Sequence, residues 1–109
     1  MKKHAFKNTT SSGSVRTIIF KEGKTWYGVA LEFNIVEAGD DHQLVSASLV
    51  EAITGYIEAV RRAKVQPFAL NQKPDEEYEK LWNQLEKRTY KAVKSPYNVY
   101  SFGRKIVSK

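Results

Sequence analysis

The stretch that decides the fold is residues 25–60, which read TWYGVALEFNIVEAGDDHQLVSASLVEAITGYIEAV. Within 27–35 every second residue is apolar, so these residues are expected on one face of a strand, and this period of two is typical of β-strands. Within 45–60 the apolar residues recur at helical spacing, which predicts an amphipathic helix of about four turns. The period changes at Gly39-Asp40, so we expect a sheet to give way to a helix there.

A second strand is expected just before this stretch. Residues 14–20 (SVRTIIF) are rich in β-branched and aromatic residues, and 21–24 (KEGK) supply a turn that contains glycine. We therefore expect a β-hairpin at 14–33, followed by a short strand near 34–38. The alternating run at 25–38 is long for one strand, so a bend or bulge is expected near Glu32–Asn34.

The first helix is expected at about 41–62, lying across the sheet. Asp40 is placed to serve as its N-cap, and Gln43, three residues later, fits the reciprocal position of a capping box. Near the other end, Glu58 and Arg62 are spaced for an i,i+4 ion pair.

The C-terminal part predicts a second helix and a strand. Residues 64–74 (KVQPFALNQKP) form a connector, because two prolines interrupt any regular structure there. A helix is expected to begin near Pro74, since the following sequence has acids at its start and Lys-Arg at its end, as the helix dipole favours. A terminal strand is expected at 98–107, where β-branched and aromatic residues are frequent.

Together these elements predict an α+β fold, in which a small antiparallel three-stranded sheet is covered by an amphipathic helix. The 109 residues suffice for one domain. We expect residues 1–13, which are polar and turn-prone, to form a flexible N-terminal tail before a single domain at 14–109. In that domain, 14–62 would form a β-β-β-α core and 63–109 a helix-containing extension.

Charge is distributed unevenly along the chain, whose net charge is +6. Residues 25–60 contain six acids and no Lys or Arg, whereas 1–24 carry a net charge of +5 and 61–109 of +7. An acidic centre is therefore flanked by basic arms, and a partner could meet either sign.

The absence of cysteine excludes disulfides and thiolate metal sites. The longest runs without a charged residue are too short for a membrane span, so a cytoplasmic protein is expected.

Strand, turn, strand, short strand, Gly-Asp and amphipathic helix follow one another in the order found in HicB-like antitoxins, and residues 15–60 resemble the N-terminal domain of that family. Family members have a Gly-Asp-Thr-x-Glu-Glu-Ala segment and then a helix that ends in Glu-Ala. Here WYGVALEFNIVEAGDD and LVEAITGYIEAV occupy the equivalent places, and five residues match the pattern: Gly39, Asp40, Leu49, Glu51 and Ala52. Asp41 replaces the usual Thr, and Gln43-Leu44-Val45 replace Glu-Glu-Ala. The Pro-rich loop of many members is also missing.

The resemblance implies a partly degenerate ribonuclease H-like β-β-β-α fold, a non-enzymatic role and a small basic ribonuclease toxin as partner. The stretch without Lys or Arg suits such a partner, because complementary charge speeds encounter and excludes wrong partners. The expected partner-binding residues are those of the acidic centre, namely Glu32, Glu37, Asp40 and Asp41. Many members add a C-terminal DNA-binding ribbon-helix-helix or helix-turn-helix, which this C-terminal part does not resemble.

A homodimer or larger assembly is also expected. The second helix carries an apolar stripe that would be exposed if the helix stood free, and a three-stranded sheet with one covering helix has open edges. The stripe either folds back on the first helix or packs on another chain. The predicted self-association residues are Tyr78, Leu81, Trp82 and Leu85.

A stand-alone nucleic-acid-binding module is the alternative function. The basic arms interleave cations with aromatic residues, which can hold phosphates and stack on bases. The candidate residues for this function are Lys91, Lys94, Arg104 and Lys105.

An enzyme has less support, and we expect no catalytic residue, metal or cofactor. Glu37, Asp40 and Asp41 would suit the metal site of a nuclease with the ribonuclease H fold. A helix cap with surface charge explains the same residues more simply. His4 and His42 have no further ligands at metal-binding spacing.

Overall fold

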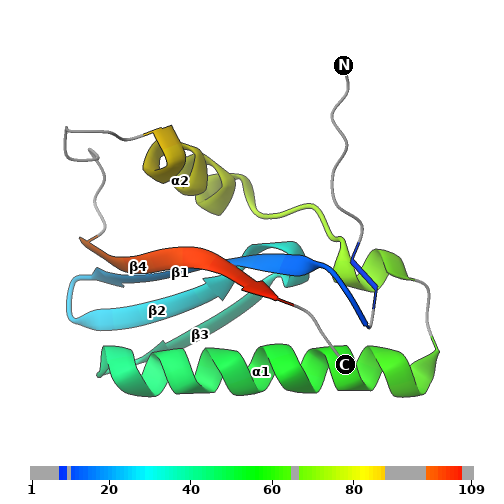
Figure 1. Ribbon diagram of the computed structural model, residues 1–109. Coiled ribbons are helices and arrows are strands. Elements are labelled where there is room, and N and C mark those ends of the chain that lie inside the picture. The colour runs from blue at the N-terminus through cyan, green and yellow to red at the C-terminus, as the bar shows by residue number, and fades with distance from the viewer. Residues whose placement is uncertain (1–7, 10, 65–66, 88–97, 107–109) are drawn as a thin grey trace.

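The computed structural model describes residues 8–9, 11–64, 67–87 and 98–106, and it contains one antiparallel sheet with a helix on either face (Figure 1). The strands are β1 (Ser14–Glu22), β2 (Thr25–Ala30), β3 (Ile35–Gly39) and β4 (Asn98–Ile106). The helices are α1 (His42–Ala63) and α2 (Glu76–Lys87), with short 3₁₀ helices η1 (Leu31–Phe33) and η2 (Pro67–Leu70). The predicted α+β class is confirmed.

The sheet has the order β3-β2-β1-β4. β1 and β2 form the expected hairpin around Gly23, whose φ of 66° is a conformation that glycine adopts without strain. The predicted C-terminal strand is confirmed as β4, which pairs along β1 and makes the sheet four-stranded. β3 and β4 are therefore the two edges, and the ladder of β4 has a register shift opposite Ile19/Phe20.

A turn of 3₁₀ helix interrupts the alternating run where a bend was expected. η1 ends at Asn34, which adopts a left-handed conformation with φ 54° and lets the chain turn back as β3. This insertion changes the phase of the alternation. Val29 and Leu31 therefore pack on the α2 side of the sheet, whereas Phe33 and Ile35 pack on the α1 side. The expectation of a single apolar face along 27–35 is wrong for this reason.

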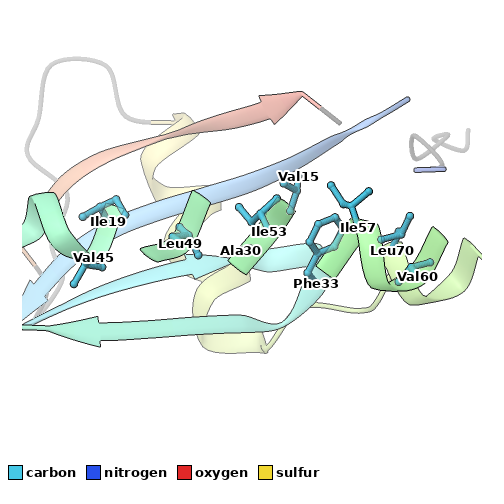
Figure 2. Close-up of a cluster of buried hydrophobic side chains, with 10 residues drawn as sticks. All are labelled: Val15, Ile19, Ala30, Phe33, Val45, Leu49, Ile53, Ile57, Val60 and Leu70. Carbon is cyan, nitrogen blue, oxygen red and sulfur yellow. The ribbon is translucent and has the colours of Figure 1, made fainter. Parts of the chain in front are cut away.

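Each face of the sheet has its own hydrophobic core. On one face the apolar stripe of α1 packs against the sheet and η2, as Figure 2 shows; its buried residues are Val15, Ile19, Ala30, Phe33, Val45, Leu49, Ile53, Ile57, Val60 and Leu70. On the other face α2 covers a second cluster, made of Ile18, Phe20, Val29, Leu31, Leu81, Trp82 and Leu85. The predicted single covering helix is thus one of two.

The stripe of α2 belongs to the fold of its own chain. Leu81, Trp82 and Leu85 are buried against β1 and β2, and Tyr78 is partly buried beside Phe20 at a ring distance of 6.0 Å. These four residues therefore do not form the self-association surface that the sequence predicted. Their apolar area is used within the chain, because the far face of the sheet is itself apolar.

A glycine permits the close packing of α1 on β2. A Cβ atom at Gly28 would lie 3.0 Å from Val45 Cγ1 and 3.1 Å from Ile19 Cδ1. Both neighbours are buried, so a larger residue would push the helix away from the sheet.

The tail predicted at 1–13 is wrong at Asn8, which is 1% exposed. Its side chain donates a hydrogen bond to the carbonyl of Leu70 and accepts one from the backbone N–H of Ser14, at 2.9 and 2.7 Å. The backbone N–H of Asn8 also donates to Asn71 Oδ1. The rest of the expected tail at 1–7 and 10 lies outside the described residues.

Helix α1 is capped by Asp41 and not by Asp40. Asp41 has an extended backbone, with φ −138°, and its side chain accepts a hydrogen bond from the N–H of Gln43 at 3.3 Å. The expected capping box is therefore wrong by one residue, because Gln43 is the second helical position and not the third.

Replacing Asp41 by Ala should lower the free energy of unfolding by about 1 kcal/mol, since an orphan N–H loses its acceptor. Asp40→Ala removes the same charge from the exposed neighbouring position and should change it by less than about 0.5 kcal/mol. Urea unfolding followed by circular dichroism measures both. Equal losses in the two variants would contradict the assignment of the cap.

Candidate functional site

The structure separates Glu32 from the other three residues of the acidic centre. Glu37 lies in β3, and Asp40 and Asp41 follow it in the turn into α1. Glu32 lies in η1, before β3 begins, so the five residues of the strand, roughly 16 Å of extended chain, separate it from Asp40. The four residues predicted to bind one partner therefore form a group of three with one residue apart.

The group of three lies along an open edge of the sheet. β3 pairs with β2 on one side, and the described residues provide no strand for the other side. Glu37 is half-buried on the face that α1 covers, Asp40 is exposed, and Asp41 is half-buried at the helix start. Val36 lies on the opposite face of β3 and is 48% exposed. We call Val36, Glu37, Asp40 and Asp41 the acidic edge.

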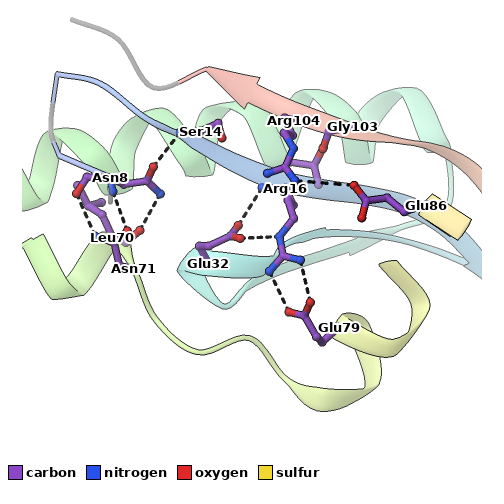
Figure 3. Close-up of polar contacts among 11 residues, drawn as sticks. Asn8, Ser14, Arg16, Glu32, Leu70, Asn71, Glu79, Glu86, Gly103 and Arg104 are labelled. Atoms are coloured by element: carbon purple, nitrogen blue, oxygen red, sulfur yellow. Dashed lines mark hydrogen bonds and ion pairs between the residues drawn. The ribbon is translucent and has the colours of Figure 1, made fainter. Parts of the chain in front are cut away.

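Glu32, in contrast, is occupied by an ion-pair cluster inside the fold (Figure 3). Arg16 of β1 donates from its backbone N–H to Glu32 Oε1 at 2.9 Å and from Nε to Glu32 Oε2. The other end of its guanidinium donates to both carboxylate oxygens of Glu79, on α2, at 2.8 and 2.9 Å. Arg16 thus links β1, η1 and α2, and Glu32 is not available to a partner.

The electrostatics of this cluster match its geometry. The side chain of Arg16 is 14% exposed. Burial disfavours its charge, but the hydrogen bonds that Arg16 donates to Glu79 and Glu32, together with the negative charge of these carboxylates, outweigh burial and raise the pKa of Arg16. The hydrogen bond from Arg16 lowers the pKa of Glu79 in turn. Bidentate pairing of this kind fixes orientation as well as charge, so the cluster holds α2 in one position on the sheet.

The residues proposed for nucleic-acid binding are not gathered into one surface. Arg104, on β4, packs over the ring of Trp82 at 5.4 Å and lies 3.9 Å from a carboxylate oxygen of Glu86. Lys105 is exposed but points to the opposite face of the sheet, beside α1. Lys91 and Lys94 lie outside the described residues.

The described part of the chain offers no group of three or more His, Cys, Asp or Glu side chains that could hold a metal ion. The three carboxylates at 37–41 do not converge, since one belongs to the strand and another caps the helix. Across the described ranges, neither helix combines the length and hydropathy that crossing a bilayer requires.

A scan against protein-family models and searches of curated proteins and of solved structures found no match. The resemblance to HicB-like antitoxins therefore rests on the residues quoted for it in the sequence, and membership of that family remains an expectation.

The Arg16 cluster could not be predicted from sequence spacing. Its members are 16 and 63 positions apart, and they meet because a strand, a 3₁₀ turn and a helix converge on one face of the sheet. A faint signal was present, since Arg16 is the one cation inside the apolar run at 14–20.

Replacing Glu79 by Gln should destabilise the fold at neutral pH by up to about 1 kcal/mol, because its carboxylate is partly exposed and water screens the pair. The pKa of Glu79 is lower in the folded chain than its ordinary value of 4.5, so the unfolded chain binds the proton first as pH falls. The stabilisation is complete above the unfolded-state pKa and is lost as pH falls through the folded-state pKa.

Urea unfolding of the wild type and of Glu79→Gln between about pH 7 and about pH 2 tests this prediction. The difference between them should shrink on acidification. The control is Glu76→Gln, an exposed change on the same helix. A difference between wild type and Glu79→Gln that stays constant with pH would show that the carboxylate charge does not matter.

Proposed function

We propose that this protein is a non-enzymatic, HicB-like regulatory protein that binds and masks a small basic protein, such as a ribonuclease toxin, through the acidic edge. The observation that carries the proposal is that an unpaired strand edge coincides with three carboxylates in a stretch that has no Lys or Arg. Opposite charge would steer a basic partner to this edge and disfavour an acidic one.

The chemistry of the acidic edge supports protein binding over catalysis. Main-chain groups on the free side of β3 can pair with a strand or loop of a partner. Val36 adds an exposed apolar side chain next to the carboxylates, and mixed apolar and charged surface is typical of protein interfaces. A catalytic site would need its acids within reach of one reacting atom, and here Asp41 is engaged as a cap.

Nucleic-acid binding is the weaker candidate on the same observations. Of its two described candidate residues, Arg104 is held between Trp82 and Glu86, and Lys105 lies on the other face. A phosphate chain would have to contact both faces of β4 to use them together. Nucleic-acid binding is therefore one of the outcomes that the experiment below can detect.

The double charge reversal Glu37→Lys/Asp40→Lys should weaken partner binding. The experiment purifies the tagged chain from its own cells and identifies by mass spectrometry a stoichiometric, small and basic companion protein. The affinity of that purified companion is then measured by calorimetry. We expect the double variant to bind at least tenfold more weakly, which corresponds to about 1.4 kcal/mol, and binding of the wild type to weaken with added salt.

The matched control is Glu51→Lys/Glu76→Lys, which reverses the same number of charges at exposed positions of α1 and α2. This control should bind the companion like the wild type. Equal binding by the control and the double variant would refute the role of the acidic edge. Copurification of RNA or DNA in place of a protein, removable by nuclease, would favour the alternative function.

A further inference from the structure

The second open edge of the sheet, β4, differs from the acidic edge in its side chains. β4 pairs with β1, and no described strand lies on its other side. Two of its aromatic side chains are exposed to an unusual degree, with Tyr100 at 56% and Phe102 at 41%. β4 also carries Arg104 and Lys105 and no acid. Tyr100 packs beside Trp26 and His42, and Phe102 packs on Trp82, but both rings keep much of their surface exposed at this edge.

One hollow lies against the free edge of β4. It has a volume of about 370 Å³ and is lined by Leu85, Val99, Tyr100, Ser101 and Phe102. The hollow touches four consecutive residues of β4 and so runs along the strand, and Leu85 and Phe102, which packs on Trp82, border it on the face that α2 covers. Leu85 of α2 closes one side of it. We call this space the edge hollow, and its lining combines the side chains of Leu85, Val99 and Phe102 with polar surface.

A second hollow lies on the α1 side, near the other end of β4. It has a volume of about 280 Å³ and is lined by Val50, Ile53, Thr54, Ile57, Glu58, Arg61 and Lys105. It exists because α1 packs mainly over β2 and β3 and leaves the neighbouring part of β4 uncovered. A Cβ atom added to Gly103 would meet nothing within 4 Å, which agrees with open space there. We call this space the helix hollow.

The helix hollow is cationic at its rim. Arg61 and Lys105 border it together with one acid, Glu58, which is ion-paired with Arg61. The ammonium group of Lys105 is thus the charge that a ligand entering from β4 would meet. An acidic side chain complements this rim, and a basic one would be repelled.

We propose that β4 binds an extended, acidic peptide segment of a partner protein, which pairs with it as a fifth strand. The main chain of the segment would bond to the free edge, one apolar side chain would enter the edge hollow, and one carboxylate would reach Lys105 in the helix hollow. Phe102 and Lys105 are three positions apart, so they point to opposite faces of the sheet about 10 Å from each other. The segment should therefore carry its apolar and acidic residues three positions apart.

The charge of β4 decides which occupant is proposed. A second β4 strand, placed alongside the first, would bring two further cations and no acid to the edge. A basic segment would meet the same repulsion. The site is also separate from the acidic edge, because β3 and β4 lie on opposite sides of the sheet.

Two peptides of identical composition test the spacing. The probe is fluorescein-labelled Thr-Glu-Thr-Thr-Leu-Thr-Thr-Glu-Thr, in which a glutamate stands three positions from leucine in either chain direction. The control is Thr-Thr-Glu-Thr-Leu-Thr-Glu-Thr-Thr, where the glutamates are two positions away and fall on the same face as the leucine. Fluorescence anisotropy with the full chain, up to about 1 mM protein, should show the probe binding at least fivefold more tightly than the control.

Two pairs of variants locate the binding. Lys105→Glu should weaken the probe at least tenfold, whereas Lys80→Glu, at an exposed position of α2, should change it less than twofold. Phe102→Ser should weaken it likewise, whereas Phe68→Ser, at an exposed residue that lines neither hollow, should not. Thermal melts by circular dichroism identify any variant that loses its fold; if Phe102→Ser does, the Lys105 pair decides.

Hydrogen exchange distinguishes strand addition from other modes of binding. With the probe bound, exchange of the β4 amides should slow, while that of the β3 amides should not change. Equal affinity for probe and control, unchanged exchange in β4, or no binding would each overturn the proposal. If light scattering shows that the chain self-associates and hydrogen exchange shows that β4 is protected without peptide, the edge belongs to a second copy of this chain. That result would overturn the proposal as well.

Discussion

The structure depends on the fact that its central strands are apolar on both faces. In β1, Val15 and Ile19 point to one side of the sheet while Ile18 and Phe20 point to the other, and all four are buried. A sheet of this kind cannot leave either face in water, because each exposed large side chain would forfeit about 1.5–3 kcal/mol of burial. Two helices are therefore required. The C-terminal part of the chain serves the fold by supplying α2 for the second face.

Covering both faces also buries a charged residue, Arg16, and the Arg16 cluster pairs that charge. Arg16 stands next to Val15 in β1, on the face that α2 covers, so its charge must be paired there. The chain provides Glu32 from the turn after β2 and Glu79 from α2, and the guanidinium also lies 5.5 Å from the ring of Trp82. The same helix that buries the cation therefore supplies one of its two carboxylates.

Local patterns predicted the elements well and their relations poorly. The hairpin, the bend near Glu32–Asn34, α1, α2 and β4 each have a local cause: alternation, a glycine turn, an apolar stripe or a charge gradient. Which side of the sheet each apolar residue faces depends on η1, whose three residues change the phase of the alternation. Asp41 rather than Asp40 is the cap because α1 begins at His42, one residue later than the sequence pattern indicated. Trp82 is buried within its own chain because the sheet has a second apolar face. The sequence shows that face in β1 only if the odd-numbered and the even-numbered residues are both recognised as apolar.

The candidate functional surfaces follow from the same constraint. Because helices cover both faces, the side chains there are used in the two cores, and the described sheet remains open at its edges, where unpaired main-chain groups offer another chain a place to pair. The two edges inherit their charge from different parts of the sequence: β3 comes from the stretch without Lys or Arg, and β4 comes from the basic C-terminal arm. The uneven charge along the chain thus places an acidic edge and a basic edge on opposite sides of the sheet, with β2 and β1 between them. If both proposed partners bind, opposite charge at opposite edges would keep the two sites from competing.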